Sequence, residues 1–220
     1  AKDTKTVCTI SENKDKIVRS EPVIKKVTGS GRGFTLEEFK RGRELFRRLK
    51  EEYGLAVPDM QMVIGEEKDS FGITKKMFMI VDRVRGRTLD KISRYPDEAL
   101  EKLDFFFAGL LKHYHDTYKK GGDFWTDPSL GNLIYGRVKG DSEDKVYIFD
   151  LDPYFKTYDS AKPSTDKFGE NHFFAFVIRR VSLGISTIEK DFEKPVKLSK
   201  ARKALDEITR DVEEVLDIKK

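Results

Sequence analysis

The chain has 220 residues, of which 38% are hydrophobic and 37% charged, a composition typical of a globular protein with a densely ionic surface. Its 43 Lys and Arg residues against 39 Asp and Glu leave a net charge of +4, too balanced to favour nucleic-acid binding. A single cysteine, Cys8, excludes an internal disulfide and a cysteine-rich zinc site. No stretch approaches the ~20 apolar residues that cross a bilayer, and residues 1–5 lack the apolar core of a signal peptide. We therefore expect a cytoplasmic protein without a membrane span.

The N-terminal part of the sequence is rich in short β-like runs. Strands separated by polar turns are predicted at Thr6–Ile10, Lys16–Arg19 and Pro22–Val27. A connector with three glycines follows at residues 28–33. Thr35, with Glu38 three residues later, forms a capping box, which predicts a helix from there to about Tyr53.

The rest of the sequence alternates between strands and longer helices. Further strands are predicted at 61–64 and 76–82, a hairpin at 133–135 and 146–149, and helices at 97–119, 171–187 and 198–217. The helix at 97–119 is apolar nearly all round, so we expect it to be buried, with His115 packed as a structural histidine rather than acting as a base. The apolar stripe of the last helix is too short for a coiled-coil seam, so we expect this helix to pack on its own chain.

The second half of the chain contains a group of residues that suits phosphate chemistry. Asp127 is followed after four residues by Asn132, which enters a predicted strand, and Asp150 follows the return strand of the same hairpin. In phosphoryl transfer one carboxylate orients and deprotonates the attacking hydroxyl, while a carboxylate and an amide oxygen hold Mg²⁺. The hairpin is expected to bring Asn132 and Asp150 side by side. Strand alternation puts Asp152 on the face of Asp150, which makes it a candidate second metal ligand.

This segment resembles the catalytic loop and metal motif of the protein-kinase-like superfamily, and is closest to the small aminoglycoside-phosphotransferase-like kinases. The pattern matched is an aspartate, four residues and an asparagine (Asp127 and Asn132), followed by an Asp-rich metal motif at Asp150. The chain departs from the family at residues 125–126, where Trp-Thr replaces His-Gly.

The resemblance implies a two-lobed α+β fold, with a strand-rich N-lobe over 1–85 and a helical C-lobe over 86–220. It also implies ATP and Mg²⁺ as cofactors, Asp127 as the catalytic base, and Asn132 and Asp150 as metal ligands.

Earlier stretches resemble the N-lobe of the same family. Residues 78–89 resemble the last strand and the hinge, which implies that the backbone at three positions would meet the adenine edge: Asp82, Arg83 and Val84. Residues 23–25 resemble the strand that carries the phosphate-binding lysine, here Lys25. The predicted helix at 36–53 resembles the one whose glutamate, here Glu44, pairs with that lysine.

Simpler interpretations of the same residues stay open. Asp, Pro, Gly and Asn are turn formers, so residues 127–132 can be a turn without chemistry. Lys25 can be a solvated surface lysine in this lysine-rich chain. Glu44 can form an exposed helix pair with Arg47 or Arg48.

The sequence therefore predicts an ATP- and magnesium-dependent phosphotransferase acting on a hydroxyl-bearing acceptor, either a protein or a small molecule. Residues 11–15 contain no glycine, so the phosphate loop of the family is missing, which motivates a second interpretation as a pseudokinase or nucleotide-binding scaffold. A third interpretation is an interaction protein that binds an acidic partner through the basic helix at 40–50. Acidic residues are interleaved there, which makes nucleic acid an unlikely partner.

Overall fold

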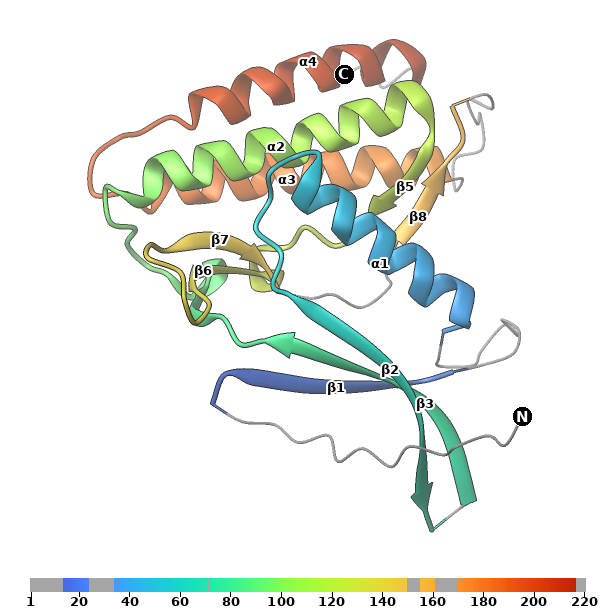
Figure 1. Ribbon diagram of the computed structural model, residues 1–220. Helices are drawn as coiled ribbons and strands as arrows, with labels where there is room; N and C mark the ends of the chain where they lie inside the picture. Colours follow the sequence, from blue (N-terminus) through green and yellow to red (C-terminus); the bar gives the residue numbers. More distant parts are fainter. Residues whose placement is uncertain (1–13, 24–33, 71, 150–154, 161–169, 217–220) are drawn as a thin grey trace.

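The computed structural model describes residues 14–23, 34–70, 72–149, 155–160 and 170–216, which form an α+β structure, as predicted (Figure 1). The α-helices are α1 (Leu36–Glu51), α2 (Ala99–Lys120), α3 (Glu170–Lys190) and α4 (Ser199–Leu216), and two 3₁₀ turns are η1 (Leu89–Lys91) and η2 (Leu130–Asn132). The strands are β1 (Lys16–Pro22), β2 (Met60–Asp69), β3 (Gly72–Asp82), β4 (Arg85–Thr88), β5 (Gly122–Trp125), β6 (Leu133–Arg137), β7 (Lys145–Ile148) and β8 (Phe155–Tyr158). The strands of the described residues form three antiparallel sheets in the orders β1-β3-β2, β4-β6-β7 and β5-β8.

The N-terminal sheet is built on the long β2–β3 hairpin, with β1 on the other side of β3. The hairpin turns at Gly72, whose φ of 135° is a conformation that other residues rarely adopt. Met77, Met79 and Val81 alternate along β3 and are buried in the core. The two predicted strands of this hairpin are confirmed as parts of longer arms. The predicted strand at 6–10, and most of the one at 22–27, lie outside the described residues.

Helix α1 begins where the sequence predicts. The Thr35 hydroxyl accepts a hydrogen bond from the Glu38 amide (3.2 Å), and the Glu38 carboxylate accepts one from the Thr35 amide (2.7 Å). This closed capping box satisfies amide groups that a helix start leaves without partners. The buried face of α1 consists of Phe39, Gly42, Leu45, Phe46 and Leu49. Figure 1 shows α1 between the N-terminal sheet and the layer formed by α2, α3 and α4.

The layer of α2, α3 and α4 contributes a large share of the apolar core. Five rings pack together between α2, β5, β8 and α3: Tyr114, Tyr118, Phe124, Tyr158 and Phe174. The predicted packing of the last helix on its own chain is confirmed, since its stripe from Leu198 to Val212 is buried. Asp104 of α2 accepts hydrogen bonds from the amides of Lys200 (3.1 Å) and Ala201 (2.8 Å), and so caps the start of α4. In the described part of the chain no helix combines the length and apolarity that a bilayer span requires.

Two close contacts join elements that are distant in the sequence. Arg41 of α1 donates to both carboxylate oxygens of Asp123 on β5, with a 3.0 Å bond from Nε, and to the hydroxyl of Thr157 on β8 (2.7 Å). Between β4 and β6, Gly86 faces Gly136, and a Cβ at either position would lie within 2.1 Å or 2.3 Å of a backbone oxygen of the other strand. The strands approach so closely only because both positions are glycine.

One apolar cluster runs from β3 and α1 through α2 to α3 and α4, and therefore crosses the expected boundary between residues 85 and 86. A second, smaller cluster of Val84, Ile134 and Tyr147 joins the end of the N-terminal sheet to the β6–β7 hairpin. The division at this boundary stays a prediction.

Candidate functional site

The loop that carries Asp127 is anchored at its start by a buried hydrogen bond. The Tyr114 hydroxyl on α2 donates to the carbonyl oxygen of Trp125 at the end of β5 (2.9 Å), and both side chains are buried. Burial, with the negative charge of Asp127 as a second cause, raises the pKa of Tyr114 well above its usual value. The phenol therefore remains a donor at all ordinary pH values and holds the loop at its start.

The loop from Asp127 to Asn132 is closed by its own hydrogen bonds. The Asn132 side-chain Nδ2 donates to the Asp127 carbonyl oxygen (3.2 Å), and the Asn132 amide donates to the Ser129 carbonyl oxygen (2.9 Å). Leu130 packs on Gly184 of α3, where a Cβ would come within 3.3 Å of the leucine side chain. The loop is thus a turn, as the simpler interpretation held, and it is also anchored on α3.

The β6–β7 hairpin brings residue 149 next to Asn132. The amide of Phe149 donates to the carbonyl oxygen of Asn132 (2.9 Å), and the predicted strand pair is confirmed. Asp150 follows Phe149 directly in the sequence. Asp150 and Asp152 themselves lie outside the described residues, so their convergence with Asn132 stays a prediction.

The Asp127 side chain has a partner that the sequence analysis did not anticipate. Arg180 of α3 donates from Nη1 to the Asp127 Oδ1 atom at 2.8 Å, across 53 residues of sequence. The guanidinium carbon of Arg180 lies 5.5 Å from the centroid of the Phe176 ring. A cation on an adjacent helix therefore faces the candidate base.

Arginines lie at both ends of the segment that contains Asp150 and Asp152. The guanidinium carbon of Arg19 on β1 is 4.6 Å from the ring centroid of Phe149, and that of Arg41 on α1 is 4.8 Å from the ring centroid of Phe155. Arg19 belongs to the strand predicted at Lys16–Arg19, whereas the family resemblance implied Lys25 as the phosphate-binding cation.

The predicted lysine–glutamate pair of the N-lobe is described only at its glutamate. Lys25 lies outside the described residues. Glu44 is on the exposed side of α1, where Arg47 donates to it from Nε (2.9 Å) and Nη2 (2.6 Å), the alternative left open above. These bonds lower the pKa of Glu44. A pairing of Glu44 with Lys25 stays a prediction.

The predicted hinge residues leave β3 toward β4. The backbone amides of Asp82 and Arg83 donate to the carbonyl oxygens of Asp59 (3.0 Å) and Asp15 (2.9 Å), and the Asp82 side chain pairs with Lys16. Val84 is buried in the smaller apolar cluster. Contact between this backbone and a purine is untested.

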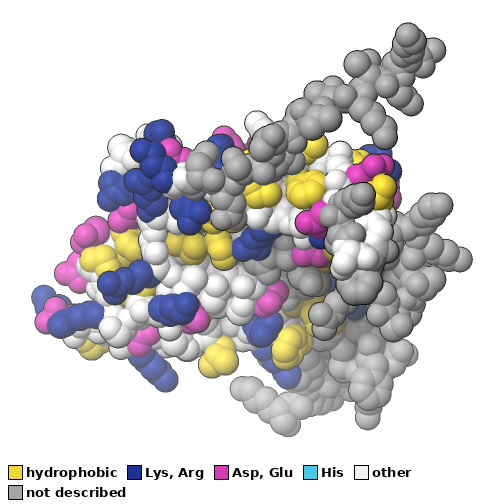
Figure 2. Space-filling model, turned by 90° about the horizontal axis from the view of Figure 1, so that it is seen from below, with side chains coloured by type: hydrophobic (Ala, Val, Ile, Leu, Met, Phe, Trp, Pro, Cys, Tyr) yellow, Lys and Arg dark blue, Asp and Glu magenta, His cyan; other side chains and the backbone are white. Residues whose placement is uncertain are grey.

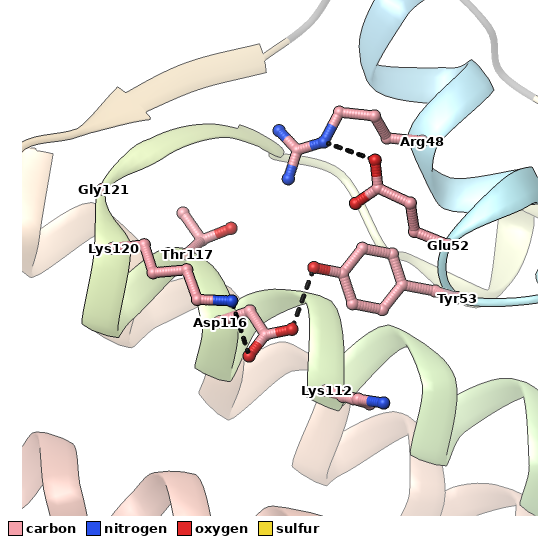
Figure 3. Close-up of a pocket in the computed structure, with 8 residues that line it drawn as sticks. All are labelled: Arg48, Glu52, Tyr53, Lys112, Asp116, Thr117, Lys120 and Gly121. Carbon is pink, nitrogen blue, oxygen red and sulfur yellow. Dashed lines mark hydrogen bonds and ion pairs between the residues drawn. The ribbon is translucent and has the colours of Figure 1, made fainter.

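A separate polar pocket lies between the end of α1 and the end of α2 (Figure 3). Its cavity of about 140 Å³ is lined by Arg48, Glu52, Tyr53, Lys112, Asp116, Thr117, Lys120 and Gly121. Figure 3 shows the Tyr53 hydroxyl directed at Asp116, to which it donates at 3.1 Å. Arg48 pairs with Glu52 and Lys120 pairs with Asp116, so of the lining residues only Lys112 adds unbalanced charge.

Behind Tyr53 lies a buried histidine. His113 has no exposed surface, its ring centroid is 5.0 Å from that of Tyr53, and neither ring nitrogen has a hydrogen-bond partner among the described residues. Burial lowers the pKa of His113 to about 3. His115, which we expected to be a structural histidine, is mostly buried and is bonded to Asp211 of α4 (2.7 Å), a contact that joins two helices.

His113 should make stability fall with acidification. Below about pH 6.5 the unfolded chain binds a proton at His113 that the folded chain excludes, so folding loses up to about 1.4 kcal/mol per pH unit until about pH 3. Urea unfolding of the wild type and His113→Leu, compared between pH 8 and pH 4, should show the variant gaining relative stability as pH falls. A stability difference that does not change with pH would mean that His113 takes up protons equally well in the folded state.

The charge pattern of α1 bears on the third interpretation. Its cations are largely paired with carboxylates: Arg41 with Asp123, Arg47 with Glu44 and Glu51, Arg48 with Glu52, and Lys50 with Asp59. The face seen in Figure 2 carries both basic and acidic side chains, with hydrophobic side chains between them. Little unbalanced positive charge remains on α1 for an acidic partner.

No protein-family model matches the chain, and no curated protein matches it. Among solved structures it is similar to one described as "WaaP in complex with acyl carrier protein", with 18% identity over 80% of this chain and 76% of that chain, and a TM-score of 0.36. A likeness at this score is too weak to support conclusions about function. The α+β fold therefore follows from the described elements themselves.

Proposed function

We propose that the chain is an ATP- and magnesium-dependent phosphotransferase with a two-lobed, protein-kinase-like fold, acting on a hydroxyl-bearing acceptor. The observation that carries the proposal is the closed Asp127–Asn132 loop. The Asn132 side chain donates to the Asp127 carbonyl (3.2 Å), and the Asn132 carbonyl accepts from Phe149 (2.9 Å), the residue before Asp150. The end of the loop is thus bonded to the residue that directly precedes Asp150 in the sequence.

In this proposal Asp127 is the general base. Its carboxylate accepts the proton of the acceptor hydroxyl while the hydroxyl oxygen forms a bond to the γ-phosphorus of ATP. The bond from that phosphorus to the oxygen bridging to the β-phosphorus breaks, and ADP leaves with the electron pair. The anchors on Tyr114 and Gly184 hold the loop in place for this step.

The metal ligands would be Asn132, Asp150 and Asp152. An amide oxygen and carboxylates are hard oxygen ligands. This set fits Mg²⁺ and does not fit a metal that prefers thiolate or imidazole ligands. Held by these residues, Mg²⁺ would supply positive charge that offsets the negative charge developing on the phosphates. Among the described residues there is no group of three or more His, Cys, Asp or Glu suited to a metal, so the proposed site depends on the two aspartates outside them.

Cations for the ATP phosphates would come from Lys25 and from Arg19, whose guanidinium lies over Phe149. Arg19 belongs to β1, which pairs with β3, the strand that leads to the predicted hinge. Since the amides of Asp82 and Arg83 already donate within the protein, a purine edge would meet their carbonyl oxygens or the backbone of Val84.

Nucleotide-dependent stabilisation tests this function. With ATP and Mg²⁺ at about 100 times the dissociation constant, linkage predicts about 2.7 kcal/mol of added stability and a rise of roughly 5–10 °C in Tm. Asn132→Ala should remove the magnesium-dependent part of the rise, as should EDTA. Release of ADP in the presence of acceptor then separates a phosphotransferase from a nucleotide-binding scaffold. A Tm that is the same with and without Mg·ATP would refute both the phosphotransferase and the nucleotide-binding scaffold.

A further inference from the structure

The exposed face of α3 beside Asp127 carries a cation between apolar side chains. Phe176 and Leu183 lie about one turn before and after Arg180 and are 50% and 68% exposed. The side chains of Arg180 and Asp127 are 42% and 40% exposed, so a ligand can reach both groups of this ion pair from solvent.

A second cation lies along the same row of rings. Lys156 of β8 places its ammonium 4.9 Å from the ring centroid of Phe173, and the Phe173 and Phe176 centroids are 5.9 Å apart. Arg180 lies over the other ring of this pair, Phe176. Arg180 and Lys156 thus lie over two neighbouring rings, and Arg180 is the cation that contacts the candidate base.

Arg180 has hydrogen-bonding capacity beyond its contact with Asp127. A guanidinium carries five N–H donors. Among the described residues Arg180 makes one hydrogen bond, from Nη1 to Asp127 Oδ1. A planar guanidinium can bind a phosphate or carboxylate through two parallel bonds, and such charged bonds are stronger than neutral ones.

We propose that Arg180 determines acceptor specificity by binding an anionic group, a phosphate or a carboxylate, that the acceptor carries close to the hydroxyl presented to Asp127. This rests on the proposed function and names the class of its substrate. Nη1 of Arg180 and Oδ1 of Asp127 are 2.8 Å apart, so with a hydrogen bond of about 3 Å from each atom the acceptor's anionic oxygen and hydroxyl oxygen lie within about 9 Å of each other. That spacing fits a sugar phosphate or a hydroxy acid.

Binding of small matched probes tests the assignment without knowledge of the natural acceptor. Glycerol 3-phosphate and glycerate carry a hydroxyl beside a phosphate or a carboxylate, and glycerol carries the hydroxyl alone. Calorimetric titration of the full chain should give binding of at least one anionic probe that is at least tenfold tighter than that of glycerol. Arg180→Ala should weaken that binding about tenfold to a hundredfold, the effect of losing a charged hydrogen-bonded partner. Arg180→Lys keeps the charge but loses the forked donor geometry, so its affinity for the probe should lie between those of wild type and Arg180→Ala.

The matched control is Arg179→Ala, which removes another exposed arginine side chain, one position earlier on α3. This change should leave probe binding unchanged. The proposal is overturned if wild type binds the anionic probes no better than glycerol, or if Arg180→Ala binds them as wild type does. It is also overturned if Arg180→Ala abolishes stabilisation by Mg·ATP, because the arginine would then serve the nucleotide. Failure of Mg·ATP to stabilise wild type, with probe binding intact, would refute the proposed function and not this site.

Discussion

Replacement of Asp127 by Asn is expected to lower the rate of phosphotransfer by about 10²- to 10⁴-fold, the usual contribution of a positioned general base. An amide has the shape of the carboxylate and can still accept a hydrogen bond from Arg180, but it cannot take up the acceptor's proton. Stabilisation by Mg·ATP should be retained, because Asp127 is not among the proposed phosphate or metal ligands. ADP release under saturating ATP gives the rate, and thermal unfolding checks that the variant is folded.

Asp206→Asn is the matched control for this experiment. Asp206 is exposed on α4, and the same change of charge there should leave the rate unchanged. A variant at Asp127 that keeps more than about a tenth of the wild-type rate would show that the carboxylate is not the base, since general bases contribute far more than that.

Replacement of Phe174 by Ala is expected to lower the free energy of unfolding by about 3–5 kcal/mol. Phe174 is 1% exposed and contacts Tyr114, Tyr118, Phe124 and Tyr158, with centroid distances from 4.8 Å to 6.3 Å. Truncation removes the ring that the other four contact and leaves a cavity between α3 and the elements α2, β5 and β8. For a chain of this length Tm should fall by roughly 10 °C, measured by calorimetry or circular dichroism.

The same truncation at Phe176 provides the comparison. This ring is 50% exposed on the opposite side of α3, so its loss should cost less than about 1 kcal/mol. Equal costs at the two positions would contradict the orientation of α3 described above.

Elements whose local chemistry is self-sufficient were predictable from the sequence. The capping box at Thr35 gives the start of α1, and the apolar stripe from Leu198 gives the packed face of α4. The β5–β8 pair was missed, because each strand has four residues and they pair across some thirty residues of chain. Arg41, which ties α1 to this pair, was likewise undetectable, since no local pattern records which surface a strand will meet.

In the candidate site, spacing predicted the Asp127–Asn132 loop, but the charges around it were not predictable. Arg180 lies 53 residues from Asp127, and the tertiary packing of α3, including its contact with Leu130, brings it there. Arg19 could have been considered, since its strand was recognised, yet a single sequence does not show which side of a strand faces the loop. Long-range juxtapositions of this kind are set by tertiary packing and not by local propensity.

Gly86 and Gly136 face each other and are needed for the approach of two strands, although neither can take part in a reaction. Neither residue has a side chain that could touch a nucleotide or an acceptor, yet a methyl group on either would collide with a main-chain oxygen of the neighbouring strand. The displaced strand is β6, which begins next to Asn132, or β4, which begins next to Val84. A screen for inactive variants would therefore return these two positions together with the ionisable ones. Because glycine has no side chain that can ionise, the loss of activity at these positions would come from the changed spacing of the two strands.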